Sequence, residues 1–124
     1  MAYTNSYLEH EVLGATRVEL VKILYRSAIE AIAHARRHLK NGEIRERSRQ
    51  ISKAWDILAE LNRSLDHMQA GELARSLCEL YVYLQNRLLE ANAARSDEPL
   101  AEAELLLNTL AEAWNQLPDI DCTY

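Results

Sequence analysis

The residues with the clearest potential for chemistry are one carboxylate and two imidazoles that share a spacing of four. Glu30, His34 and His38 would lie on one face of a helix, where three such groups could hold a metal ion. Bundles that bind two iron ions use Glu-x-x-His pairs and place carboxylates within the apolar face. The chain has neither feature. These residues therefore indicate a solvated helix face, and a metal-binding bundle is the alternative.

Nucleophilic and redox chemistry have no recognisable site in the sequence. Cys78 and Cys122 lie 44 positions apart, without a C-x-x-C motif or a zinc-binding histidine pattern, so we interpret Cys78 as a packing residue in a helix. The sequence contains no G-x-S-x-G motif and no P-loop. We expect no enzymatic activity, no cofactor and no metal. The unpaired thiols favour a reducing cytoplasm.

Charge is unevenly distributed along the 124 residues. Residues 1–60 carry ten Lys or Arg and eight Asp or Glu, a net +2, whereas residues 61–124 carry four and eleven, a net −7. The one basic cluster is interrupted by two glutamates and consists of Arg36, Arg37, Lys40, Arg45, Arg47, Arg49 and Lys53. Nucleic-acid sites need a stronger basic patch with interleaved aromatic residues. We interpret the cluster as a solvated helix face, with a docking patch for an acidic partner as the alternative.

No stretch of the chain has the pattern of a membrane-spanning or secretory segment. There is no run of about 18 apolar residues. The N-terminal sequence MAYTNSYLEHE lacks the basic start and the apolar core of a signal peptide. We expect a cytoplasmic protein that does not insert into membranes.

Composition and periodicity predict an all-α fold in a single domain over residues 1–124. Helix breakers are scarce, with three Gly and two Pro, and strong helix formers are abundant. Apolar residues recur at intervals of three and four, and turn or capping signals separate the runs. This predicts helices over residues 16–39, 44–68, 72–93 and 98–117, with a tail at 118–124. Short links make successive helices antiparallel, so we expect an up-down-up-down four-helix bundle.

The third of these helices has the strongest pattern, GELARSLCELYVYLQNRLLEAN from residue 71 to residue 92. One of its faces should be buried and contains Leu73, Leu77, Leu80, Leu84 and Leu88. Tyr81 joins this face, whereas Tyr83 lies on the solvent-exposed side. An exposed tyrosine favours contact with a partner.

Residues 1–15 carry apolar side chains outside any long helical pattern. Tyr3, Tyr7 and Leu8 could cover a groove between helices until an amphipathic segment of a partner displaces them. Disorder or permanent docking of this segment is the alternative.

The order and spacing of these features resemble those of the flagellar export chaperone family FliS. The resemblance covers nearly the whole chain and is carried by the two N-terminal tyrosines, Ala15-Thr16, Glu19-Leu20-Val21, Leu24-Tyr25, Ile51-Ser52-Lys53-Ala54, Leu65-Asp66, the segment 71–92 and Glu112-Ala113-Trp114. Some positions depart from the family pattern. Arg17 replaces a frequent proline, Ala70 replaces the first of two glycines, and the two tyrosines are four rather than three residues apart.

The resemblance implies a non-enzymatic chaperone that binds the disordered C-terminal region of flagellin, prevents premature polymerisation and assists delivery to the flagellar export apparatus. An export-gate protein or a co-chaperone would be a further partner. The implied lid residues are Tyr3, Tyr7 and Leu8. The implied groove residues are Val21, Tyr25, Trp55, Leu58, Tyr81, Tyr83 and Leu84. The alternative is a helical-bundle interaction module for another secretion or regulatory protein.

Overall fold

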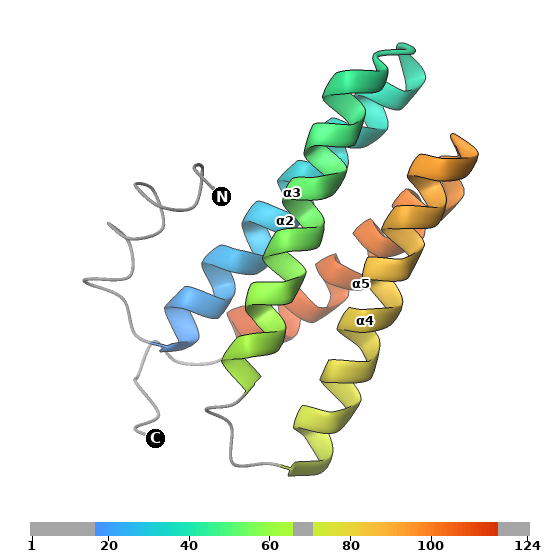
Figure 1. The fold of residues 1–124 in the computed structure, drawn as a ribbon. Helices are drawn as coiled ribbons and strands as arrows, with labels where there is room; N and C mark the ends of the chain where they lie inside the picture. The colour runs from blue at the N-terminus through green and yellow to red at the C-terminus, as the bar shows by residue number, and fades with distance from the viewer. Residues whose placement is uncertain (1–16, 66–70, 117–124) are drawn as a thin grey trace.

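A computed structural model describes residues 17–65 and 71–116 and contains four α-helices in these ranges. In chain order they are α2 (Arg17–Lys40), α3 (Ile44–Ser64), α4 (Gly71–Ala94) and α5 (Glu98–Asn115). Successive helices run in opposite directions (Figure 1). The expected lid at 1–15, the tail at 118–124, and the expected helical residues 16, 66–68 and 117 lie outside the described residues.

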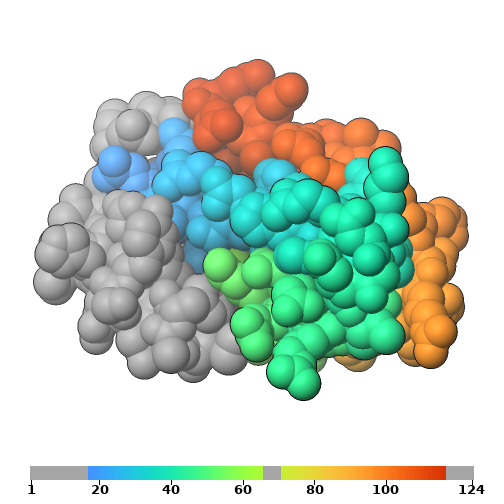
Figure 2. All heavy atoms as spheres, turned by 90° about the horizontal axis from the view of Figure 1, so that it is seen from above, coloured from blue at the N-terminus to red at the C-terminus, as the bar shows by residue number. Residues whose placement is uncertain are grey.

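The four helices pack in a ring around one core. α2 contacts α3 and α5, and α4 contacts the same two helices. Figure 2 shows the molecule from above, with α2 between α3 and α5. This arrangement confirms the predicted all-α, antiparallel four-helix bundle. None of the described helices is both long enough and apolar enough to cross a membrane.

The apolar residues that recur every three or four positions form the core. On α2, the small side chains of Ala28, Ala31 and Ala35 are at most 1% exposed, which allows neighbouring helices to approach closely. One prediction about the apolar face of α4 is wrong, because Leu73 is 51% exposed. Leu73 lies in the first turn of α4, and α4 begins at one end of the bundle (Figure 1).

A tight turn at Asn41-Gly42, a dipeptide typical of turns, joins α2 to α3. Gly42 has a φ of 72°, a left-handed conformation that glycine adopts without a steric penalty. The amide of Gly42 donates to the Leu39 oxygen at 3.2 Å, and the amide of Glu43 donates to the His38 oxygen at 2.9 Å. These two bonds form a Schellman motif, which satisfies carbonyl groups at the end of α2.

Candidate functional site

Two buried tyrosines meet at the centre of the bundle. The hydroxyl oxygens of Tyr25 on α2 and Tyr81 on α4 are 2.6 Å apart, and the two ring centroids are 6.4 Å apart. Trp114 of α5 lies next to Tyr25, with 6.3 Å between ring centroids. The hydroxyl pair therefore connects the two helices that face each other across the ring, and the tryptophan adds a third helix to the cluster.

Burial raises the pKa of both phenols above the usual value of 10.0. At Tyr81, the neighbouring Tyr25 raises the pKa further. At Tyr25, contacts with Tyr81 and Trp114 lower the pKa by less than burial raises it. Both hydroxyls are therefore neutral near pH 7, and one donates a hydrogen bond to the oxygen of the other.

Five of the seven predicted groove residues lie in the core. Tyr25, Leu58 and Leu84 have no exposed surface, and Tyr81 and Val21 are 1% and 9% exposed. Their side chains fill the space between helices and belong to one core cluster. In the described structure these five positions therefore have almost no surface open to a partner. Periodicity predicts that such residues are buried but does not distinguish the floor of a groove from the core.

The other two predicted groove residues are accessible. Trp55 is partly buried and packs against the core from α3. Tyr83 is 43% exposed on α4, as its spacing predicts, and its hydroxyl donates to Glu102 Oε2 at 2.7 Å. The three predicted lid residues lie outside the described residues: Tyr3, Tyr7 and Leu8.

Beside Tyr83, one arginine connects three carboxylates. Arg87 Nε lies 2.6 Å from Glu102 Oε1, and its terminal nitrogens lie 3.3 Å from Glu90 and 3.3 Å from Glu98. Hydrogen bonds from Tyr83 and Arg87 lower the pKa of Glu102, whereas the bond with this carboxylate raises the pKa of Tyr83. Because three carboxylates surround one guanidinium, this edge of α4 and α5 carries an excess of negative charge.

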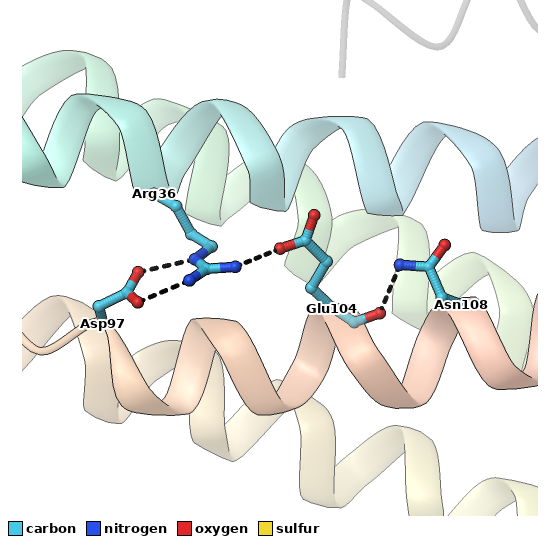
Figure 3. Close-up of polar contacts among 4 residues, drawn as sticks. All are labelled: Arg36, Asp97, Glu104 and Asn108. Atoms are coloured by element: carbon cyan, nitrogen blue, oxygen red, sulfur yellow. Dashed lines mark hydrogen bonds and ion pairs between the residues drawn. The ribbon is translucent and has the colours of Figure 1, made fainter.

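A second arginine connects α2 to α5 (Figure 3). Arg36 Nε and Nη2 each lie 2.8 Å from one carboxylate oxygen of Asp97, and Nη1 lies 2.6 Å from Glu104 Oε1. These hydrogen bonds raise the pKa of Arg36 above its already high value. Asn108, one turn further along α5, donates to the main-chain oxygen of Glu104 at 2.9 Å. Arg36, one residue of the basic cluster, therefore forms its described ion pairs with carboxylates of this chain.

Arg47 departs from the prediction that the whole basic cluster is a solvated face. It is only 5% exposed, and its Nε donates to Asn92 Oδ1 at 2.9 Å. The hydroxyl of Ser48 donates to the same oxygen at 3.2 Å. The prediction is wrong for Arg47 because its guanidinium bridges the first half of α3 and the end of α4.

The residues of the metal-binding alternative do not converge. His38 Nδ1 lies 2.7 Å from Glu43 Oε1, next to the α2–α3 turn. Glu30 lines a surface pocket of about 330 Å³ between α2 and α5, which it shares with the cationic side chains of Lys22 and Arg26. Within residues 17–65 and 71–116, no group of three His, Cys, Asp or Glu is close enough to hold a metal ion.

Several exposed apolar side chains were not identified from the sequence. The described helices expose six large apolar residues: Ile44, Leu73, Val82, Tyr83, Leu89 and Leu105. Of these, sequence analysis singled out Tyr83 alone as exposed. A signal for two others was present, because Val82 and Leu89 are seven positions apart and therefore share the helix face opposite the leucines. Exposed apolar side chains of this kind favour binding to other proteins.

Comparisons with known proteins agree with a surface that favours binding to other proteins. The chain matches the family model described as "Flagellar protein FliS" over residues 1–120. It is 36% identical over 117 residues to the flagellar secretion chaperone FliS of Salmonella typhimurium, a match that covers 94% of this chain and 87% of the relative. It is 33% identical over 113 residues to the flagellar secretion chaperone FliSB of Pseudomonas aeruginosa, covering 91% and 90%. The Bacillus subtilis FliS is 31% identical over 111 residues, covering 90% and 82%. The chain therefore belongs to the FliS family.

Proposed function

We propose that this protein is a flagellar export chaperone that binds the disordered C-terminal region of newly made flagellin. Binding would prevent premature polymerisation and assist delivery to the export apparatus. The observation that carries the proposal is the family match over residues 1–120, together with relatives that are named flagellar secretion chaperones. The described bundle is compatible with this role, because it combines one core with exposed apolar side chains on α3, α4 and α5.

The need for such a chaperone follows from the properties of a filament subunit. Its terminal segments are amphipathic, since they pack as coiled helices in the filament. An unassembled subunit therefore exposes apolar faces that self-associate. A partner that binds a disordered segment must offset the entropy lost on ordering with a large contact area. Exposed apolar side chains on three helices would supply contacts over such an area.

In the proposed mechanism the protein acts by binding alone, without an enzymatic step or a cofactor. It would work in the bacterial cytosol, where flagellin is synthesised, and an export-gate protein or a co-chaperone would meet the loaded complex. The net −7 of residues 61–124 would attract basic surfaces of such partners and repel acidic ones.

Trp55 and Tyr83 are our candidates for direct contact with flagellin among the seven groove residues implied by the family resemblance. Both are accessible, whereas the other five stabilise the bundle that presents them. We further propose that Tyr3, Tyr7 and Leu8 form a lid over a flagellin-binding surface and are displaced when flagellin binds.

Isothermal titration of the full-length protein with a peptide that spans a flagellin C-terminal region tests the proposed function. We expect one-to-one binding with a strongly negative heat-capacity change, because folding of the peptide onto the bundle removes apolar surface from water. A peptide of the same composition in scrambled order is the control. Absence of binding to every cognate flagellin would leave a helical bundle with a different partner.

Tyr7→Ala tests the lid separately from the function. If Tyr7 holds the lid closed, its truncation increases the population of the open state, and the association rate constant for the flagellin peptide should rise several-fold. Stopped-flow mixing measures this rate, and Tyr124→Ala in the expected tail is a matched control. An unchanged rate would remove the lid from the mechanism, even where equilibrium binding persists.

A further inference from the structure

One end of the bundle gathers exposed basic side chains that have no ion pair. The α2–α3 and α4–α5 links both lie at this end (Figure 1), and a contact of 2.8 Å between Arg36 and Asp97 connects the end of α2 to the α4–α5 link. The exposed cationic residues here that form no ion pair with a described residue are Arg37, Lys40, Arg45, Arg49 and Arg95. We refer to these residues as the turn-end patch.

Most carboxylates at the same end already have a partner. Those with a described partner are Glu43, Glu90, Asp97 and Glu98, which contact His38, Arg87, Arg36 and Arg87. The exposed Glu46 is the exception among the described residues of this end. The turn-end patch is therefore positive, although the whole chain carries a net charge of −5.

The patch is assembled by the fold and differs from the basic cluster of the sequence. The Ser48 hydroxyl on α3 lies 3.2 Å from Asn92 Oδ1 on α4, and in this antiparallel register Arg45 lies level with Arg95. Arg95 is far from the sequence cluster and joins the patch only in three dimensions. Arg36 belongs to the cluster but is paired with carboxylates of α5 and its preceding link.

Arg95 occupies a backbone position that favours glycine. Its φ is 53°, in the left-handed region that residues other than glycine adopt at a cost in free energy. The amide of Ser96 donates to the Ala91 oxygen at 3.1 Å, the bond of a Schellman motif with Arg95 as the left-handed residue. The arginine therefore lowers the stability of the end of α4, and residues held in such conformations cluster at functional sites.

Arg47 adds a cation that the fold has already removed from most of its water. It is 5% exposed, and its described side-chain hydrogen bond runs from Nε to Asn92 Oδ1. Among the described residues, Gln50 Oε1 is the one fully buried side-chain nitrogen or oxygen without a partner, so the unpaired terminal nitrogens of Arg47 reach the surface. Side chains lean toward the N-terminus of their helix, so Arg47, in the first turn of α3, leans toward the turn end. A buried guanidinium without a carboxylate is costly, and a carboxylate of a partner would offset that cost.

We propose that the turn-end patch, together with Arg47, is the docking site for an acidic segment of a second protein, whose aspartate and glutamate side chains pair with these arginines. Guanidinium groups bind carboxylates through two parallel hydrogen bonds, and arginine is enriched at protein interfaces. Ile44, which is 55% exposed in the first turn of α3, supplies an apolar contact at the same end. The partner differs from the flagellin C-terminal peptide, so this inference goes beyond the proposed function and does not depend on it.

The charge distribution favours a short protein segment over a nucleic acid or an anionic membrane. Since the chain is −5 overall, the surfaces outside the patch are acidic, and one of them is the edge of α4 and α5 where Arg87 faces three carboxylates. An extended polyanion would meet these surfaces and be repelled. The patch also contains no aromatic residue on which nucleic-acid bases would stack. A short segment with several carboxylates contacts the patch alone.

Fluorescence anisotropy of a fluorescein-labelled hexaglutamate peptide, titrated with the full-length protein at low salt, tests the site. We expect binding that weakens as salt is added, because salt screens exposed charges. Arg45→Gln and Arg95→Gln should each weaken binding several-fold, and the double variant should weaken it about tenfold. Arg75→Gln is the matched control and should leave the affinity unchanged. Arg75 is also exposed and without a described ion pair, but it lies near the start of α4, at the other end of the bundle.

Arg95→Gly separates binding from stability. Glycine adopts the left-handed conformation without a steric penalty, so thermal unfolding should occur at a higher temperature than in the wild type. The affinity for hexaglutamate should nevertheless fall as much as in Arg95→Gln. Wild-type affinity in the glycine variant would remove Arg95 from the site, and a lower melting temperature would contradict the strain that singles out this arginine.

Further measurements identify the occupant. Absence of salt-sensitive hexaglutamate binding, or equal weakening by Arg75→Gln, would overturn the site. Tighter binding of an oligothymidylate or of phosphatidylglycerol vesicles, lost in the double variant, would assign the patch to phosphate groups and overturn the acidic segment. Loss of binding to the flagellin C-terminal peptide in the double variant would assign the patch to flagellin and overturn the second partner. If the wild type binds hexaglutamate at this patch but no flagellin peptide, the docking site stands and the proposed function fails.

Discussion

Tyr81 and Tyr83 are two positions apart and have opposite environments, being 1% and 43% exposed. The rotation of about 100° per residue in a helix was enough to predict this difference. It did not predict the partner of either hydroxyl. Tyr81 meets Tyr25 across the bundle, and Tyr83 meets Glu102 of α5. Such pairs depend on helix register and side-chain rotamers, which the periodicity of one helix does not determine.

The Tyr25–Tyr81 pair makes the stability of the bundle depend on two hydroxyls together. Tyr25→Phe removes the described hydrogen-bond partner of the Tyr81 hydroxyl, and we expect the free energy of unfolding to fall by about 1–3 kcal/mol. Replacing Tyr81 by Phe as well removes the unpaired group, so the double variant should recover much of this loss. Urea unfolding of the Tyr25→Phe, Tyr81→Phe and double variants, followed by circular dichroism, measures all three differences from the wild type.

Tyr83→Phe is the control for this cycle. Tyr83 is 43% exposed and its hydrogen bond to Glu102 is an exposed one, so the free energy of unfolding should change by less than about 0.5 kcal/mol. Strictly additive losses at Tyr25 and Tyr81 would show that the two hydroxyls contribute independently and that their hydrogen bond adds no stability.

The faces of the helices were easier to predict than the interactions at their ends. α5 begins at Glu98 with Pro99 in its first turn, and both residue types are favourable at the start of a helix. The carboxylate of Asp97 nevertheless forms no capping bond with α5 and binds Arg36 of α2 instead. Capping rules use local neighbours, whereas this arginine is 61 positions away in the sequence.

Arg36 and Asp97 should therefore act as a pair in stability measurements. The pair is partly exposed, so Arg36→Ala and Asp97→Ala should each lower the free energy of unfolding by about 1 kcal/mol or less. In the Arg36→Ala background, Asp97→Ala should have a smaller effect than in the wild type. Thermal unfolding measures this coupling, which should diminish at high salt.

Glu112→Ala, at an exposed acidic residue within α5, controls for a general change in charge and should leave the Arg36 effect unaltered. An Asp97→Ala effect of the same size with and without Arg36 would contradict the pairing. Asp97 would then act mainly on the N-terminus of α5, through its favourable interaction with the helix dipole.

For the whole molecule, the fold was more predictable than the set of apolar residues that stay exposed. Apolar faces and short links restrict the chain to an antiparallel bundle, whereas the core and the exposed apolar positions are built from the same residue types. Leu58 and Leu84 were expected to line a groove and lie in the core, while Val82 and Leu89 are exposed on α4. An apolar residue is buried or exposed according to how many neighbouring helices cover its helix face. That number is set by the assembled bundle.

The single core predicts that the bundle unfolds as one unit. Buried residues from all four helices form one cluster, so no helix can separate from the bundle without exposing apolar surface of the others.

The two tryptophans report on different helices, Trp55 on α3 and Trp114 on α5. Trp55→Phe and Trp114→Phe each leave one reporter, and within each variant fluorescence and circular dichroism should give the same urea midpoint. An earlier fluorescence transition for Trp114 alone would mean that α5 separates first, and that the α2–α5 interface, including the Arg36 contacts, is the weakest boundary of the bundle.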